Sequence, residues 1–146
     1  MRILVINGPN LNLIGDRERE IYGETGYGEL CRSIETYAKG LSVDAEVYQS
    51  NGEGDIVTKI QQAKKNFDAI VINAGALTHY SYAVYDALKY AGLPIVEVHI
   101  SNIFKREEFR KTSVLSPIAV GVVSGLGIDG YFYAIDFLKK TNGKTV

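Results

Sequence analysis

Short runs of apolar, β-branched residues recur along the chain. Runs of this length that are rich in Val and Ile predict buried β-strands. The predicted strands cover residues 2–7, 43–49, 69–73, 94–100 and 118–125. The fourth run continues as IVEVHISN, residues 95–102, where a glutamate and a histidine interrupt an otherwise apolar strand. Because its apolar positions predict burial on both faces, these two ionisable residues need an explanation.

The segments between the strands carry the spacing of amphipathic helices. The clearest one begins near Tyr27, with Thr25 as a candidate cap and apolar residues at i, i+3, i+4 and i+7. Its apolar face predicts Cys31 to be a core residue. Further helices are predicted over residues 53–65, 80–91 and 128–140.

Strands and helices alternate through the whole sequence. This alternation predicts an α/β fold with a parallel sheet and helices on both faces. Five strands suit a flavodoxin-like three-layer sandwich with strand order 2-1-3-4-5. No linker or repeat divides the chain, so we expect a single domain over residues 1–146.

The composition excludes several classes of partner. Lys and Arg number 16 against 17 Asp and Glu, a balance that predicts neither a nucleic-acid interface nor a membrane surface site. No apolar run approaches the length of a membrane span, and the run at residues 3–6 is too short for a signal peptide. With its single cysteine, the chain is predicted to be a cytoplasmic protein without an intrachain disulfide or a CxxC metal site.

Polar residues gather where the predicted strands end. In open α/β sheets, ligands bind at the carboxyl ends of the strands. Asn7 and Asn73 end the first and third strands, and Glu97 and His99 lie near the end of the fourth. The only other histidine, His79, follows the third strand. This edge is therefore the predicted site.

Glu97 and His99 are two residues apart in a strand, so their side chains point the same way. One interpretation is a polar pair in the core whose two members hydrogen-bond to each other. The other is a general acid, an imidazolium held and oriented by a carboxylate. The backbone amides of Ile100 and Ser101, just beyond, are candidates for binding a small carboxylate.

The first strand-to-helix connection is long. Such loops are commonly lids, and this one contains Arg17, Arg19 and Tyr22 around several acidic residues. The loop is either a charged segment exposed to solvent, or it places an arginine beside a tyrosine and so lowers the pKa of the tyrosine. A nearby cation lowers the pKa of a phenol, and a phenolate is a competent base for a proton α to a carbonyl.

The stretch NAGALTHYSYAVYDAL, residues 73–88, begins at a strand end and enters a helix that Thr78 or Ser81 can cap. Tyrosines cover too much of this helix for one core face, so much of this set either packs on another subunit or is exposed. They are Tyr80, Tyr82, Tyr85 and Tyr90.

The sequence GLGIDG, residues 125–130, matches a dinucleotide fingerprint but follows the last strand instead of the first. A nicotinamide cofactor is therefore rejected. A phosphoacceptor module would need aspartates where Asn7 and Asn73 stand, and a flavodoxin would show a hydroxyl-rich phosphate loop after the first strand. These binding modules and another lyase or isomerase for a small hydroxy-keto acid remain as alternatives.

Several stretches together resemble type II 3-dehydroquinate dehydratase, the flavodoxin-like dehydroquinase. They are INGPNLNLIG, REREIYG, NAGALTHYSYAVYDAL and VEVHISNIFKREEFRKTSVLSPIAVGVVSGLGIDGY. The resemblance implies reversible dehydration of 3-dehydroquinate to 3-dehydroshikimate in the shikimate pathway, which leads to chorismate and the aromatic amino acids. It further implies no cofactor, no metal, no Schiff base and a dodecamer built of trimers.

The resemblance also implies roles for individual residues. In the catalytic set, Tyr22 is the base and Arg17 is the arginine that activates it. Asn10 holds a water near the developing enolate. His99 is the general acid, and Glu97 is its partner. The substrate-binding set is Asn73, His79, Ile100, Ser101 and Arg110, with Asp86 reaching a neighbouring subunit's site. One departure from the family is Arg19, which replaces a proline of the usual lid.

Overall fold

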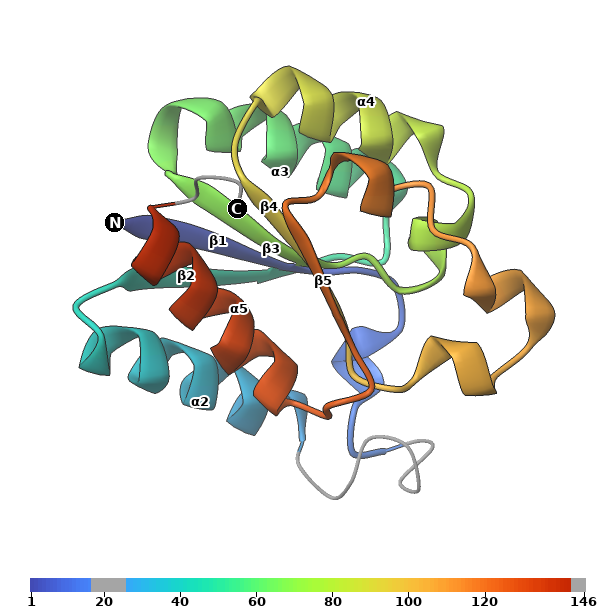
Figure 1. Ribbon diagram of the computed structural model, residues 1–146, viewed down its shortest axis with the longest axis horizontal. Helices are drawn as coiled ribbons and strands as arrows, with labels where there is room; N and C mark the ends of the chain where they lie inside the picture. The colour runs from blue at the N-terminus through green and yellow to red at the C-terminus, as the bar shows by residue number, and fades with distance from the viewer. Residues whose placement is uncertain (17–25, 143–146) are drawn as a thin grey trace.

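The structure is a computed structural model that describes residues 1–16 and 26–142 (Figure 1). Its five strands form one parallel sheet in the order β2-β1-β3-β4-β5, which confirms the predicted topology. The strands are β1 (Arg2–Asn7), β2 (Asp44–Gln49), β3 (Ala69–Asn73), β4 (Ile95–His99) and β5 (Gly121–Ser124). The last strand is shorter than predicted because a 3₁₀ turn, Ser116–Ile118, occupies the start of its apolar run.

Four helices of the described chain cover the sheet in two layers. Helices α3 and α4 pack on one face, and α2 and α5 pack on the other (Figure 1). Their bounds are α2 (Tyr27–Gly40), α3 (Glu53–Asn66), α4 (Tyr82–Ala91) and α5 (Asp129–Thr141). Each lies within two residues of the predicted helix, so the apolar periodicity located all four.

A hydrophobic core lies on each side of the sheet. Alternate residues of β4 serve the two cores: Val96 and Val98 pack toward α2 and α5, and Ile95 packs toward α3 and α4. All five residues of β4 are buried, as the sequence predicted for this strand. Glu97 therefore lies inside the protein, on the side of the sheet that α3 and α4 cover.

The structure shows which residue caps α4. Ser81 caps α4 by accepting the backbone N–H of Val84 at 3.0 Å, whereas Thr78 bonds elsewhere. Helix α2 starts after Gly26, which offers no side-chain cap; Thr25 lies outside the described residues.

Cys31 was predicted to be a core residue, and this is wrong. It is only partly buried, because the inward stripe of α2 is Leu30, Ile34 and Ala38.

The ends of β1 and β3 approach each other closely, which brings their connecting loops to one place. The backbone N–H of Gly8 donates to the carbonyl of Asn73 at 2.8 Å. A β-carbon at Gly8 would lie 2.3 Å from the carbonyl oxygen of Ala74, closer than any side chain tolerates. The glycine is therefore required for this contact.

In the described ranges, no helix has both the length and the apolar character of a membrane span.

Candidate active site

A small cleft opens at the carboxyl ends of β3 and β4. Its walls come from the ends of these strands and from the loops that follow them. Six of the predicted residues line it, although they come from segments far apart in sequence: Asn73, His79, His99, Ile100, Ser101 and Arg110. The structure thus brings together most of the residues that the sequence selected at this edge.

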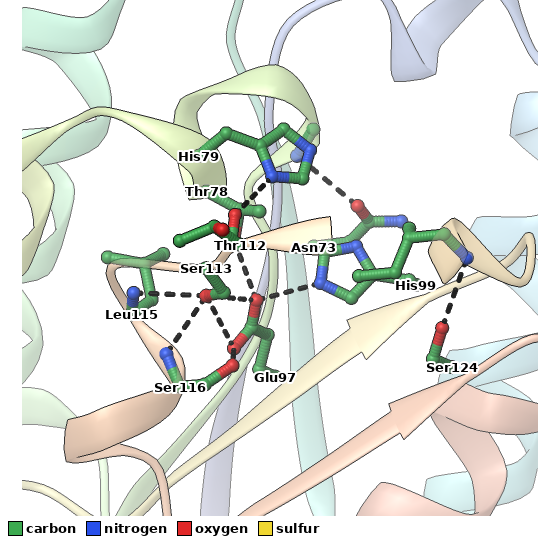
Figure 2. A network of polar contacts seen from close by, with 12 residues as sticks. Asn73, Thr78, His79, Glu97, His99, Thr112, Ser113, Leu115, Ser116 and Ser124 are labelled. Atoms are coloured by element: carbon green, nitrogen blue, oxygen red, sulfur yellow. Dashed lines mark hydrogen bonds and ion pairs between the residues drawn. The ribbon is translucent and has the colours of Figure 1, made fainter. Parts of the chain in front are cut away.

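Glu97 lies beneath the cleft with no exposed surface. Its carboxylate accepts hydrogen bonds from Nε2 of His99 and Oγ1 of Thr78, both at 2.7 Å (Figure 2). The hydroxyls of Ser113 and Ser116 also donate to it. All of these donors satisfy one buried carboxylate, so the cost of desolvating its charge is offset.

These hydrogen bonds determine the charge of Glu97. Burial alone would raise the pKa of this carboxyl group, because a desolvated charge is unfavourable. The hydrogen bonds from His99, Ser116 and Thr78 outweigh burial and hold the pKa of Glu97 well below its usual range. Glu97 is therefore a carboxylate at neutral pH, facing the ring of a histidine that is 5% exposed and lines the cleft.

The two histidines of the cleft bond to the protein through different ring nitrogens. Nδ1 of His79 lies 2.7 Å from the carbonyl oxygen of Thr112, which can only accept, so Nδ1 carries the hydrogen. Burial lowers the pKa of His79, which favours the neutral ring with Nε2 as an acceptor. In His99 the bond to Glu97 uses Nε2 and leaves Nδ1 for a ligand. The two rings are nearly parallel, with centroids 6.4 Å apart.

Two arginines give the cleft a positive side. Arg110 and Arg106 both line it, and Glu107 lies between them. Nε of Arg110 donates to Glu107 at 2.7 Å, and Nε of Arg106 is 3.8 Å from the same carboxylate. The hydrogen bond from Arg110 lowers the pKa of Glu107. Forked guanidinium groups held in this way suit the recognition of a carboxylate ligand.

The backbone after β4 is fixed by the glycine-rich segment that resembled a dinucleotide fingerprint. The N–H of Gly125 donates to the carbonyl of His99 at 3.1 Å, and the N–H of Gly127 donates to that of Ile100 at 3.0 Å. Gly125 has a φ of +86°, a conformation that favours glycine. These glycines hold Ile100 and Ser101 in place at the cleft.

Besides Glu97, two predicted residues of the described chain do not line the cleft. Asn10 is exposed in a left-handed conformation, with its backbone N–H donating to Asn51 at 2.9 Å, while the adjacent Leu11 lines the cleft. Asp86 is exposed on α4. Tyr22 and Arg17 lie outside the described residues, so their predicted positions stay predictions.

Known proteins are similar to this chain over nearly its whole length. The family model described as Dehydroquinase class II covers residues 1–139. The chain belongs to the class II dehydroquinase family. The flavodoxin-like order of its sheet agrees with that assignment.

The relatives of this class II dehydroquinase are similar over nearly their whole length. A 3-dehydroquinate dehydratase from Caldicellulosiruptor saccharolyticus is 52% identical over 143 residues, with 97% of this chain and 99% of the relative covered. The one from Lachnospira eligens is 56% identical over 138 residues, with 93% and 94% covered. The crystal structure of type II dehydroquinase from Butyrivibrio crossotus is 53% identical, covers 94% of this chain and 97% of its own, and superposes with a TM-score of 0.92.

Sequence reasoning did not select several residues of this dehydroquinase site. Arg106 lines the cleft, and its Nη1 lies 3.3 Å from Oγ of Ser101. The one available signal was its place, four residues before Arg110 and soon after the end of β4. Thr78, Ser113 and Ser116 surround Glu97, but no sequence spacing connects them to β4.

In the described part of the chain, no group of three His, Cys, Asp or Glu side chains is arranged to hold a metal ion.

Proposed function

We propose that this chain catalyses the reversible trans-dehydration of 3-dehydroquinate to 3-dehydroshikimate. The observation that carries the proposal is the buried Glu97–His99 pair, which opens on the same small cleft as Arg106 and Arg110. The names of three relatives support it, since they are 3-dehydroquinate dehydratases about half identical to this chain. The proposal assigns the catalysis to a single domain over residues 1–146.

The reaction removes a hydroxyl from the carbon β to a ketone. It needs a base for the α-proton and an acid for the departing oxygen. We assign the base to the phenolate of Tyr22, which takes the α-proton and leaves its electron pair in an enolate. The enolate then forms the new carbon–carbon double bond as the C–O bond breaks. His99 donates a proton to the departing hydroxyl, which leaves as water.

Glu97 supports His99 in two ways. Its bond to Nε2 fixes the ring so that Nδ1 is the nitrogen available to the leaving hydroxyl. Its negative charge also stabilises the positive charge of the protonated ring. Among the other predicted catalytic residues, Arg17 favours the phenolate form of Tyr22, and Asn10 holds a water near the developing enolate.

The remaining residues bind the substrate. Arg110 and the backbone amides of Ile100 and Ser101 hold its carboxylate, and Arg106 adds a second positive charge beside them. His79, neutral and protonated on Nδ1, presents Nε2 as an acceptor for a substrate hydroxyl. The acid and base are both protein side chains, so the proposal needs no cofactor, no metal and no imine with a lysine.

The proposal includes a homo-oligomer, a dodecamer built of trimers, in which Asp86 reaches a neighbouring subunit's site. Support comes from the tyrosines at and before α4: Tyr80, Tyr82 and Tyr90 each have more than half of their surface exposed in the single chain. Large exposed aromatic groups on one helix are typical of an interface. The physiological setting we propose is the shikimate pathway in the cytoplasm.

The test is a direct assay on the purified protein. Conversion of 3-dehydroquinate creates a conjugated enone, which absorbs in the ultraviolet. His99→Ala, purified in the same way, should lose about 10²–10⁴-fold in kcat with a smaller change in KM, because proton donation is realised in the transition state. A wild-type protein without enone formation would exclude the activity. A His99→Ala variant with normal kcat and only a raised KM would exclude the acid role and leave a binding role.

A further inference from the structure

A buried chain of hydrogen bonds runs behind the cleft, from β3 through α5 to β1. Its centre is Tyr131, which lies in the first turn of α5 and has no exposed surface. The phenol oxygen of Tyr131 is 3.0 Å from Nδ2 of Asn73 and 2.6 Å from Oδ1 of Asn7. Asn7 and Asn73 are register partners at the ends of β1 and β3. Of these three residues, only Asn73 lines the cleft.

One fixed donor determines the direction of every bond in this chain. The backbone N–H of Gly75 can only donate, and it lies 3.3 Å from Oδ1 of Asn73. The other end of the Asn73 carboxamide is then its nitrogen, which can only donate to Tyr131. Tyr131 consequently uses its own hydrogen for Oδ1 of Asn7. The nitrogen of Asn7 in turn faces the hydroxyl of Tyr27 at 3.4 Å.

This directionality fixes the carboxamide of Asn73. Its oxygen is held by Gly75 and its nitrogen by Tyr131, so the side chain has one favoured orientation although its two ends have nearly the same shape. An amide nitrogen carries two hydrogens. Tyr131 accepts one of them, and the other remains for a ligand in the cleft.

We propose that Tyr131 is a positioning residue, which orients the carboxamide of Asn73 so that it presents an N–H donor to an oxygen of the substrate. Tyr131 acts only through Asn73, because its own side chain is buried behind the cleft. This inference rests on the proposed dehydratase function and extends it to a residue that does not line the cleft.

Removal of the phenol oxygen tests the proposal. In Tyr131→Phe, the nitrogen of Asn73 loses its acceptor, and the longer bond from Gly75 is then all that this network leaves to orient the carboxamide. KM for 3-dehydroquinate should rise about three- to tenfold, the range expected for one neutral hydrogen bond, with a smaller change in kcat. Tyr37→Phe is the matched control, because it removes a phenol that bonds to Asp136 at 2.9 Å on α5, and it should leave KM unchanged.

The decisive comparison is a double variant. If Tyr131 acts through Asn73, Tyr131→Phe should have no further effect on KM when Asn73 is already Ala. An equal rise in KM in both backgrounds would show a general structural role and overturn the proposal. An unchanged KM in the single variant would overturn it as well. If the wild type forms no enone, the proposed function fails instead.

A measurement on the wild type keeps the proposal testable should Tyr131→Phe not fold. With ¹⁵N-labelled asparagine, the side-chain amide signals of Asn73 are those that Asn73→Ala removes. One of the two hydrogens should be protected from exchange by Tyr131, and the other should shift when 3-dehydroquinate is added. Two unprotected hydrogens, or no shift on either, would overturn the proposal.

Discussion

The carboxylate of Glu97 lies 2.7 Å from Nε2 of His99, two residues along the same buried strand. Three hydroxyl groups, from Thr78, Ser113 and Ser116, donate to the same carboxylate. The pair therefore has the hydrogen bonds that a charged group needs inside a protein. It is also adjacent to a cleft, which a purely structural pair would not require.

The stability of the protein should depend on the charge of Glu97. Its pKa is lower in the folded state than in the unfolded chain, so its stabilising effect is present above the unfolded value of 4.5 and is lost as the pH falls toward 2. Glu97→Gln should lower the free energy of unfolding by about 1–3 kcal/mol at pH 7. The difference between wild type and variant should shrink below pH 4.5, as urea titrations at several pH values would measure. A constant difference would contradict the assigned charge.

His79 should be neutral at pH 7 and protonated on Nδ1. Burial lowers its pKa, so the ring should become charged only at a pH below the ordinary histidine value of 6.5. Folding then favours the neutral ring, and His79 should reduce stability progressively as the pH falls below 6.5. ¹⁵N NMR of the histidine ring nitrogens distinguishes the two tautomers. An Nε2-protonated ring would disagree with the bond to Thr112, and a pKa above 6.5 would disagree with the effect assigned to burial.

Gly8→Ala should destabilise the protein by roughly 1–3 kcal/mol, because the new methyl group would collide with the backbone of Ala74 and push β1 and β3 apart. The matched control is Gly54→Ala in α3, where a β-carbon would meet nothing within 4 Å. That variant should gain about 0.5–1 kcal/mol from helix propensity. Chemical denaturation gives both values. Equal effects at the two positions would exclude the close approach as the cause.

Tyr22→Phe should lose at least about 10²-fold in kcat while substrate still binds, since only the proposed base is removed. An ordinary phenol is ionised in about one molecule in 1,000 at pH 7, so the reaction needs a nearby cation to favour the phenolate. Because activity rises as the phenol of Tyr22 ionises, Arg17→Lys should move the acidic side of the pH–rate profile to higher pH. Turnover against pH for the three proteins tests both residues. Substantial activity in Tyr22→Phe with an unshifted profile in Arg17→Lys would assign the base elsewhere.

The fold and the centre of the site were predictable because both follow short-range periodicities. A period of two in β4 places Glu97 and His99 on one side, and the pair is found there. Strand ends of a parallel sheet share one edge, so Asn73 and His79 could be placed near the same cleft. The alternation of strands and helices likewise gave the order of the sheet.

The rest of the site depends on contacts between segments distant in sequence. Ser113 and Ser116 reach Glu97 through a 3₁₀-rich connection whose path no spacing determines. Tyr131 looks like an ordinary core aromatic in its helix, and only its bonds to Asn7 and Asn73 reveal a polar function. Cys31 was misplaced because helical spacing alone does not show which edge of an apolar stripe the sheet covers.

The alternation of β4 also has a consequence for folding. If this strand paired one residue out of alignment, Glu97 and His99 would point into the core that contains Val96 and Val98, away from every hydroxyl that now bonds to the carboxylate. The carboxylate would lose the hydroxyl donors that offset its desolvation, whereas a strand of Val and Ile alone could shift at little cost. The Glu97–His99 pair thus favours the observed alignment of β4 over an alignment shifted by one residue.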